Sequence, residues 1–107
     1  MTDEPKTPMP APSLTTRERA HLKARAHDLE PVVRVGHAGL TDAAVASIDR
    51  ALEAHELIKV RIGEGDREER AEISASITAR TGAAVVQRVG RVLVLWRPSP
   101  IAGDTAP

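Results

Sequence analysis

Two glycines three residues apart, Gly36 and Gly39, are the strongest local sign of chemistry in the sequence. They follow a valine-rich run at residues 31–35 and precede Thr41, which begins an alanine-rich run. This pattern predicts that a strand, a bare backbone turn and a helix N-terminus meet at one point. Such a place suits the binding of phosphate, because the first N–H groups of a helix lack internal partners and the helix dipole favours negative charge there.

The turn has a structural interpretation as well as a functional one. Gly36 could supply a positive φ at the end of the strand, and Gly39 could allow close packing. In the functional interpretation, the absent side chains let a nucleic-acid backbone lie against the loop, as in the Gly-x-x-Gly clamp of KH-type domains. His37 could then donate a hydrogen bond or stack on a base, whereas Ala38 offers only its backbone.

Nucleotide-binding fingerprints do not fit the same residues. The P-loop needs a lysine directly after its last glycine, but Leu40 follows Gly39. The dinucleotide fingerprint needs a third glycine and an acidic residue about 20 positions further on. A small phosphate ligand stays open as an alternative.

No set of residues suggests catalysis or metal binding. The chain has no Cys, which excludes thiol chemistry, disulfides and Cys-ligated metals. The four histidines, His21, His27, His37 and His55, lack the spacing of a ligand set, and the carboxylates crowd at expected helix starts. Trp96 is the only aromatic residue, so stacking of several bases is not available. We therefore expect no enzyme activity, no metal and no cofactor.

The formal net charge of zero hides an uneven distribution. Residues 13–39 hold five Arg or Lys against three acids, and residues 40–72 hold five against nine. Residues 73–97 hold four Arg and no acid. A polyanion could bind if the basic segments share a face. The basic residues that we select as candidates for such binding are Arg17, Lys23, Arg25, Arg34, Lys59 and Arg61.

Alternating helix and strand patterns must position these residues. Helices are predicted to start at Thr15, at Thr41 and at Asp66, the first and last with a capping-box Glu three positions on. The first helix has a narrow apolar stripe of Leu22, Ala26 and Leu29. Strands are predicted at 31–35, 57–62, 85–89 and 92–96, the last two forming a hairpin at Gly90.

The resulting order, α-β-α-β-α-β-β, predicts an α/β fold with a mixed four-stranded sheet. We expect two layers, with all three helices on one face, because so small a core cannot support three layers. Arg34, Lys59 and Arg61 then lie on the open face, together with Arg88 or Arg97. The strand order stays open.

The domain is expected at residues 14–98, between flexible tails at 1–13 and 99–107 that are rich in Pro and small residues. The longest apolar runs are only a few residues, so we expect no membrane span and no signal peptide. The expected location is the cytoplasm.

Three separated blocks, residues 22–41, 51–61 and 92–98, resemble the CRM domain family, and within it the bacterial YhbY-like members. The resemblance covers residue 14 to about residue 99. It implies an α/β fold similar to the C-terminal domain of translation initiation factor three. It also implies RNA binding, with bacterial members linked to precursors of the large ribosomal subunit.

Carried over to this sequence, the resemblance places the Gly-x-x-Gly loop on Gly36, His37, Ala38 and Gly39. The leading hypothesis is therefore a monomeric module that binds structured ribosomal RNA during assembly of the large (50S) subunit. Phosphates would bind the loop backbone, and the basic residues of the first helix and the sheet would supply the charge. Two alternatives stay open: a protein-interaction adaptor on the ribosome, and a small enzyme acting on a phosphometabolite.

Overall fold

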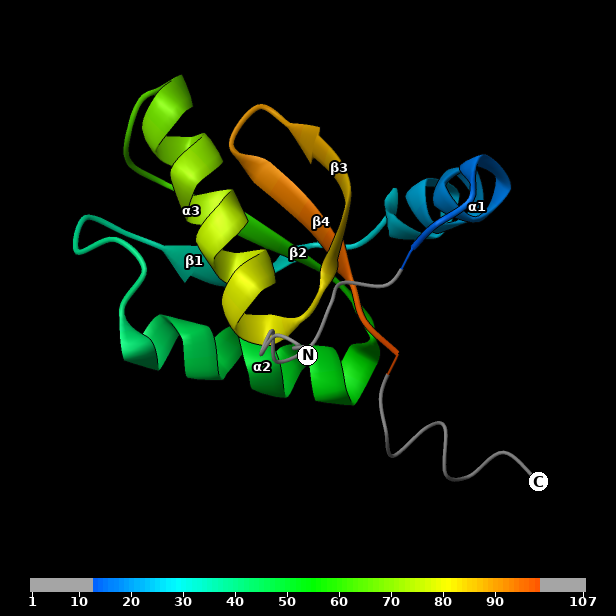
Figure 1. Cartoon of the computed structure of the whole chain (residues 1–107), viewed down its shortest axis with the longest axis horizontal. Helices are drawn as coiled ribbons and strands as arrows, with labels where there is room; N and C mark the ends of the chain where they lie inside the picture. The colour runs from blue at the N-terminus through cyan, green and yellow to red at the C-terminus, as the bar shows by residue number, and fades with distance from the viewer. Residues whose placement is uncertain (1–12, 99–107) are drawn as a thin grey trace, which may run out of the picture.

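The computed structural model describes residues 13–98 and contains three helices and one four-stranded sheet (Figure 1). The elements are α1 (Thr16–Ala26), β1 (Pro31–Val35), α2 (Asp42–His55), β2 (Leu57–Ile62), α3 (Arg67–Thr81), β3 (Ala84–Val89) and β4 (Val92–Trp96). The predicted α-β-α-β-α-β-β order is confirmed. The predicted tails lie outside the described residues, apart from Ser13.

The helices begin at the caps that the sequence predicts. Thr15 Oγ1 accepts a hydrogen bond from Glu18 N, and Glu18 Oε1 accepts one from Thr15 N, at 3.0 and 2.9 Å. Asp66 and Glu69 form the same reciprocal pair at the start of α3. Thr41 caps α2 without a partner glutamate. Each cap satisfies N–H groups that a helix start would otherwise leave without acceptors.

The sheet has the strand order β1-β2-β4-β3, which settles the point that the sequence left open. β1 and β2 are parallel, and β4 runs antiparallel between β2 and β3. The hairpin of β3 and β4 turns at Gly90, whose φ is 59°. The chain therefore places the last strand at the centre of the sheet, next to β2.

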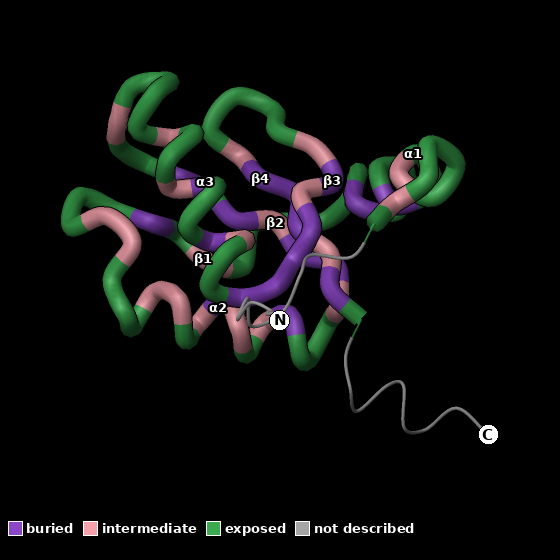
Figure 2. Tube along the Cα trace, viewed as in Figure 1, coloured by how far each residue is buried: buried purple, intermediate pink, exposed green. Residues whose placement is uncertain are grey.

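The main core lies between the sheet and the pair α2 and α3. Its buried residues come from both helices and from all the strands except β3, which adds the partly buried Val85 at the edge. Figure 2 shows these buried positions along the strands and on the helix sides that meet them. As predicted, Ile58, Val60 and Ile62 point into this core.

The position of α1 corrects the expected arrangement of layers. Leu22 and Ala26 pack with Leu57, Val86 and Val94, which form a second cluster separate from the main core. α1 therefore lies on the opposite face of the sheet from α2 and α3 (Figure 1). The expectation that all helices share one face is wrong. The apolar stripe of α1 is narrow, so the small apolar area on the second face of the sheet is enough to bury it, and the rest of that face stays uncovered.

The apolar stripe of α1 is also shorter than expected. Leu29 lies after the helix and is 37% exposed. No helix within residues 13–98 is long and apolar enough to cross a membrane.

Candidate functional site

The loop between β1 and α2 is a tight hydrogen-bonded turn. Gly39 N donates to Gly36 O at 2.9 Å, and Thr41 N donates to Gly39 O at 3.0 Å. Gly39 has a φ of 79°, in the left-handed region that side chains with a Cβ rarely adopt. The conformation of the loop therefore requires glycine at position 39.

Gly36 has no such requirement. Its φ is not positive, and a Cβ built at this position would meet no atom within 4 Å. Gly39 likewise has open space around its Cβ position, so neither glycine permits close packing. Of the two structural roles considered from the sequence, only a positive φ is found, and it belongs to Gly39. The fold leaves the bare backbone at Gly36 unexplained.

Several N–H groups in the loop are available to a ligand. Within residues 13–98, the backbone N–H groups of His37, Ala38 and Leu40 have no hydrogen-bond acceptor. At the start of α2, Thr41 Oγ1 accepts from Ala44 N at 3.1 Å. The loop can thus donate several hydrogen bonds to an anion without breaking any of its own.

One flank of the loop is acidic. Gly36, His37 and Gly39 line a shallow hollow of about 360 Å³ together with Glu64, Gly65, Glu69, Glu72 and Ile73. These glutamates belong to α3 and to the turn that precedes it. Because like charges repel, an anion is disfavoured on this side.

The other flank is basic and continues onto the sheet. Arg34 is the partner of Arg61 in the register of β1 and β2, and the two share the face that carries α1. Lys59 lies on the same face, two residues from Arg61, and its Nζ donates to His27 O at 3.4 Å. The cations therefore form a path from the loop toward α1.

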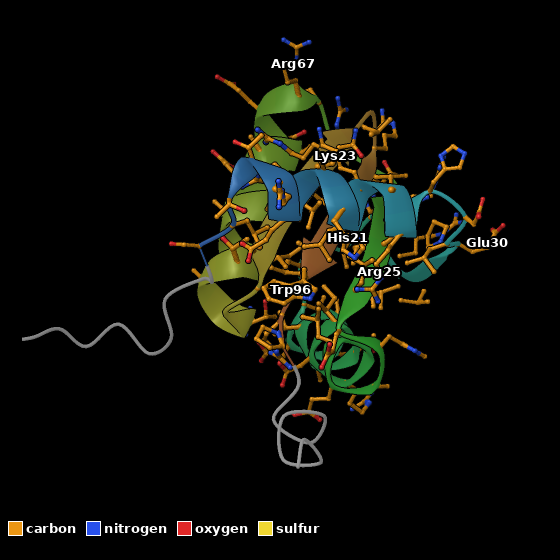
Figure 3. All side chains as sticks on the ribbon, turned by 90° about the vertical axis from the view of Figure 1, so that its right-hand side faces the viewer. His21, Lys23, Arg25, Glu30, Arg67 and Trp96 are labelled. Atoms are coloured by element: carbon orange, nitrogen blue, oxygen red, sulfur yellow. The ribbon has the colours of Figure 1, made fainter. Side chains whose placement is uncertain are left out.

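The basic residues of α1 form two rows, one on each side of its buried stripe. Arg17, His21 and Arg25 recur every four residues and line a hollow of about 450 Å³ with Trp96. Lys23 lines a different groove, of about 490 Å³, together with Lys59 and Arg61. Figure 3 shows Lys23 on one edge of α1, and His21 and Arg25 on the edge toward Trp96.

The predicted site residues are thus only partly brought together. Arg34, Arg61, Lys59 and Lys23 follow one another across the sheet, starting beside the Gly36–Gly39 loop. Arg17 and Arg25 lie on the far side of α1, and α1 and the loop lie at opposite sides of the molecule (Figure 1).

Arg88 and Arg97 were alternatives for the open face, and neither of them lies on it. Arg88 is level with Leu93 of the main core, although its side chain is exposed. Arg97 is only 9% exposed, and its Nη1 donates to Asp49 Oδ1 at 2.5 Å and to Thr81 O at 2.7 Å. It joins the end of β4 to α2 and α3, so this prediction is wrong.

Another cation that the sequence did not single out also has a structural role. Arg19 Nη1 donates to Val85 O at 2.6 Å and to Val86 O at 3.0 Å, where β3 has a bulge. This contact fastens α1 to the edge of the sheet. Within residues 13–98, no group of three or more His, Asp or Glu is arranged to hold a metal ion.

Comparison with known proteins gives one family and several relatives. The profile of the CRS1 / YhbY (CRM) domain matches residues 14–97. A protein of Haemophilus influenzae named "RNA-binding protein" is 47% identical over 87 residues, which are 81% of this chain and 88% of the relative. The protein of Bacillus subtilis named "Probable RNA-binding protein YqeI" is 33% identical over 86 residues, which are 80% and 90% of the two chains.

The fold also has a counterpart among solved structures. The solution structure of SAV1595 from Staphylococcus aureus is similar to this chain with a TM-score of 0.72 and 29% sequence identity. The similarity covers 81% of this chain and 91% of that one. The helix and sheet arrangement described above is therefore shared with that protein.

Proposed function

The chain belongs to the CRS1/YhbY (CRM) domain family, and we propose that it is a non-enzymatic RNA-binding module that associates with structured ribosomal RNA during large-subunit assembly. The proposed RNA-binding unit is residues 14–98. The observation that carries the proposal is Gly36, which the fold does not require to be glycine. A bare backbone beside unbonded N–H groups is what the close approach of a sugar-phosphate backbone needs.

In this proposal, the loop and the cation path act together. A phosphate accepts hydrogen bonds from the N–H groups of His37 and Ala38, while Arg34 and Arg61 supply charge. His37 is exposed and can add a side-chain hydrogen bond. The acidic hollow on the α3 side supports an approach from the face that carries Arg34.

Lys59 and Lys23 extend the same surface, and Arg17 and Arg25 form a second basic surface across α1. Structured RNA is large enough to contact both. Contacts to phosphate are expected to dominate the affinity, so binding should weaken steeply as salt rises.

Binding of large-subunit ribosomal RNA fragments by Gly36→Asp tests the loop. The added carboxylate meets open space in the protein but repels phosphate, so affinity should fall about tenfold, which corresponds to about 1.4 kcal/mol. Gly36→Ala should fold equally well and show a smaller loss. Ala75→Asp adds the same charge on the exposed side of α3 and serves as the control.

The measurement is fluorescence anisotropy over a salt series, with circular dichroism to confirm folding. If folded Gly36→Asp binds like the wild type while Arg61→Gln does not, the loop assignment is wrong. If the wild type binds no ribosomal RNA fragment at any salt concentration, the RNA-binding proposal itself is wrong.

The assembly role needs a separate experiment. The protein should co-sediment with immature large subunits and be released by salt. Gly36→Asp should be found mainly in the free fractions. Sedimentation with mature ribosomes alone would contradict a role in assembly.

A further inference from the structure

The groove between α1 and the uncovered part of the sheet has two chemically different sides. Lys23 and Ala26 of α1 form one wall, together with His27, which caps the C-terminal end of the helix. The sheet provides the floor, to which all four strands contribute; its lining residues are Pro31, Lys59, Arg61, Gln87, Val89, Val92 and Val94. No acidic residue lines this groove, in contrast to the hollow beside the glycine loop.

The strand register sorts these residues across the sheet. In one row, Arg61 of β2 is level with Val92 of β4, which is level with Val89 of β3. In the next row, Lys59, Val94 and Gln87 have the same order. The cations of the floor therefore lie on β2, and its valines lie on β4 and β3.

A bulge in β3 creates the apolar side. The register of β3 shifts between Val85 and Gln87, so Gln87 lies on the same face as Val86 rather than facing the main core. The same shift places Val89, two residues further on, on the face that carries α1. Val89 is 55% exposed, so much of its apolar surface is not buried by the fold. Val89 belongs neither to the main core nor to the cluster that packs against α1.

We propose that this groove binds an unpaired segment of RNA, with its phosphates over Lys59 and Arg61 and its bases over Val89 and Val92. The inference rests on the proposed function and extends it, because it names the form of RNA bound and residues not previously assigned to binding. The amide of Gln87, at the far edge, is placed to hydrogen-bond a base edge.

The two-sided floor favours a single strand over a duplex. An A-form duplex presents phosphates and 2′-hydroxyls on its outer surface and buries its base faces, so it leaves the valines without an apolar partner. A single strand carries its charge along one side and its flat base faces along the other, which matches the order across the sheet. An acidic amphipathic peptide has a similar division and is the alternative that the experiment must separate.

The test compares three fluorescein-labelled probes. They are a short oligoribonucleotide that cannot pair with itself, the same strand annealed to its complement, and an abasic ribose-phosphate strand of equal length. The full chain is titrated with each probe, and binding is followed by anisotropy. The abasic strand reports the phosphate contacts alone.

The Val89→Thr/Val92→Thr double variant removes apolar surface while it keeps β-branched residues in the strands. It should bind the single strand about three- to fivefold more weakly, the size expected when the two sites together lose the burial of roughly one methyl group. Its affinity for the duplex and the abasic strand should not change. Val32→Thr alters a valine that is 52% exposed on β1, outside this groove, and should leave all three affinities unchanged.

Arg61→Gln should weaken binding of the single strand and the abasic strand alike. The groove assignment is overturned if the wild type and the folded valine variant bind the single strand with equal affinity. In that case, binding of the large-subunit ribosomal RNA fragments by the wild type still supports the proposed function. The groove assignment is also overturned, in favour of a protein partner, if an Asp/Glu-rich amphipathic peptide binds more tightly than the single strand and the valine variant loses affinity for that peptide.

Discussion

Gly36 and Gly39 look equivalent in the sequence and differ in the structure. Gly39 is needed for a φ of 79°, whereas Gly36 adopts a conformation open to any residue and has space for a side chain. The sequence could locate the turn because two glycines after a valine run signal one. It could not assign the roles, since φ depends on how the turn joins α2.

This difference predicts opposite effects of alanine on stability. Gly39→Ala should lower the free energy of unfolding by about 1 kcal/mol because of strain at positive φ. Gly36→Ala should leave it unchanged or raise it by up to about 1 kcal/mol, because alanine reduces the entropy of the unfolded chain. Urea denaturation followed by circular dichroism measures both, and equal losses would show that the backbone at Gly36 is also constrained.

Arg97 illustrates a second limit at the residue scale. β4 is a central strand with apolar residues on both faces, so polar and apolar residues do not alternate along it. Its sequence therefore gives no indication of the face on which the next residue, Arg97, lies. The sequence could therefore offer Arg97 only as an alternative to Arg88 on the open face, and in the structure Arg97 lies on the side of α2 and α3.

Replacing Arg97 with Met should destabilise the protein by about 2–3 kcal/mol, because the buried Thr81 carbonyl loses its donor and α2 loses a link to β4. Asp49→Asn should cost less, since the Asp49 side chain is 47% exposed and water can replace part of the contact. Thermal unfolding of the two variants gives the comparison. A larger loss for Asp49→Asn would contradict this account of the contact.

At the scale of elements, the sequence predicted the helices and strands well and the layers poorly. Caps such as Asp66 with Glu69, and the alternation of β2, are local signals that survive in the fold. The face on which α1 packs depends on where the sheet has apolar residues outside the main core. Two of these residues, Val86 and Val94, belong to β3 and β4, far from α1 in the sequence. The bulge near Val86 is equally non-local, because it appears only when β3 pairs with β4.

α1 should consequently detach more easily than the rest of the fold. Leu22→Ala removes the largest side chain that α1 buries and should raise amide hydrogen exchange throughout α1, while β2 and β4 change little. Leu52→Ala, in the main core, should instead raise exchange in the whole sheet. Exchange measured by mass spectrometry on peptides distinguishes the two patterns, and a uniform increase in Leu22→Ala would show that α1 unfolds only with the whole domain.

For the whole molecule, a net charge of zero conceals a separation of charge by surface. Cations continue from Arg34 across the sheet face that carries α1, and glutamates flank the loop on the α3 side. The sequence showed the uneven distribution along the chain, but the fold was needed to decide which segments share a face. It unites Lys23 with Lys59 and separates both from Arg17 and Arg25.

Neutralising the acidic flank should therefore strengthen binding of RNA. Glu64→Gln/Glu72→Gln should raise affinity about threefold at low salt, and the gain should disappear as ions screen the charges. Glu69 is left intact because it caps α3. Glu53→Gln removes an exposed charge near the C-terminal end of α2 and should have little effect. An equal gain from Glu53→Gln would indicate that only the total charge matters.

The single tryptophan gives this molecule an optical property of its own. Trp96 packs, partly buried, against the cluster that holds α1, and the chain has no Tyr or Phe. Its ultraviolet emission therefore comes from one indole at the contact between α1 and the sheet. Release of α1 exposes this indole to water and shifts its emission to the red, while the far-ultraviolet spectrum reports the secondary structure as a whole. Docking of one helix can thus be followed in the unlabelled protein.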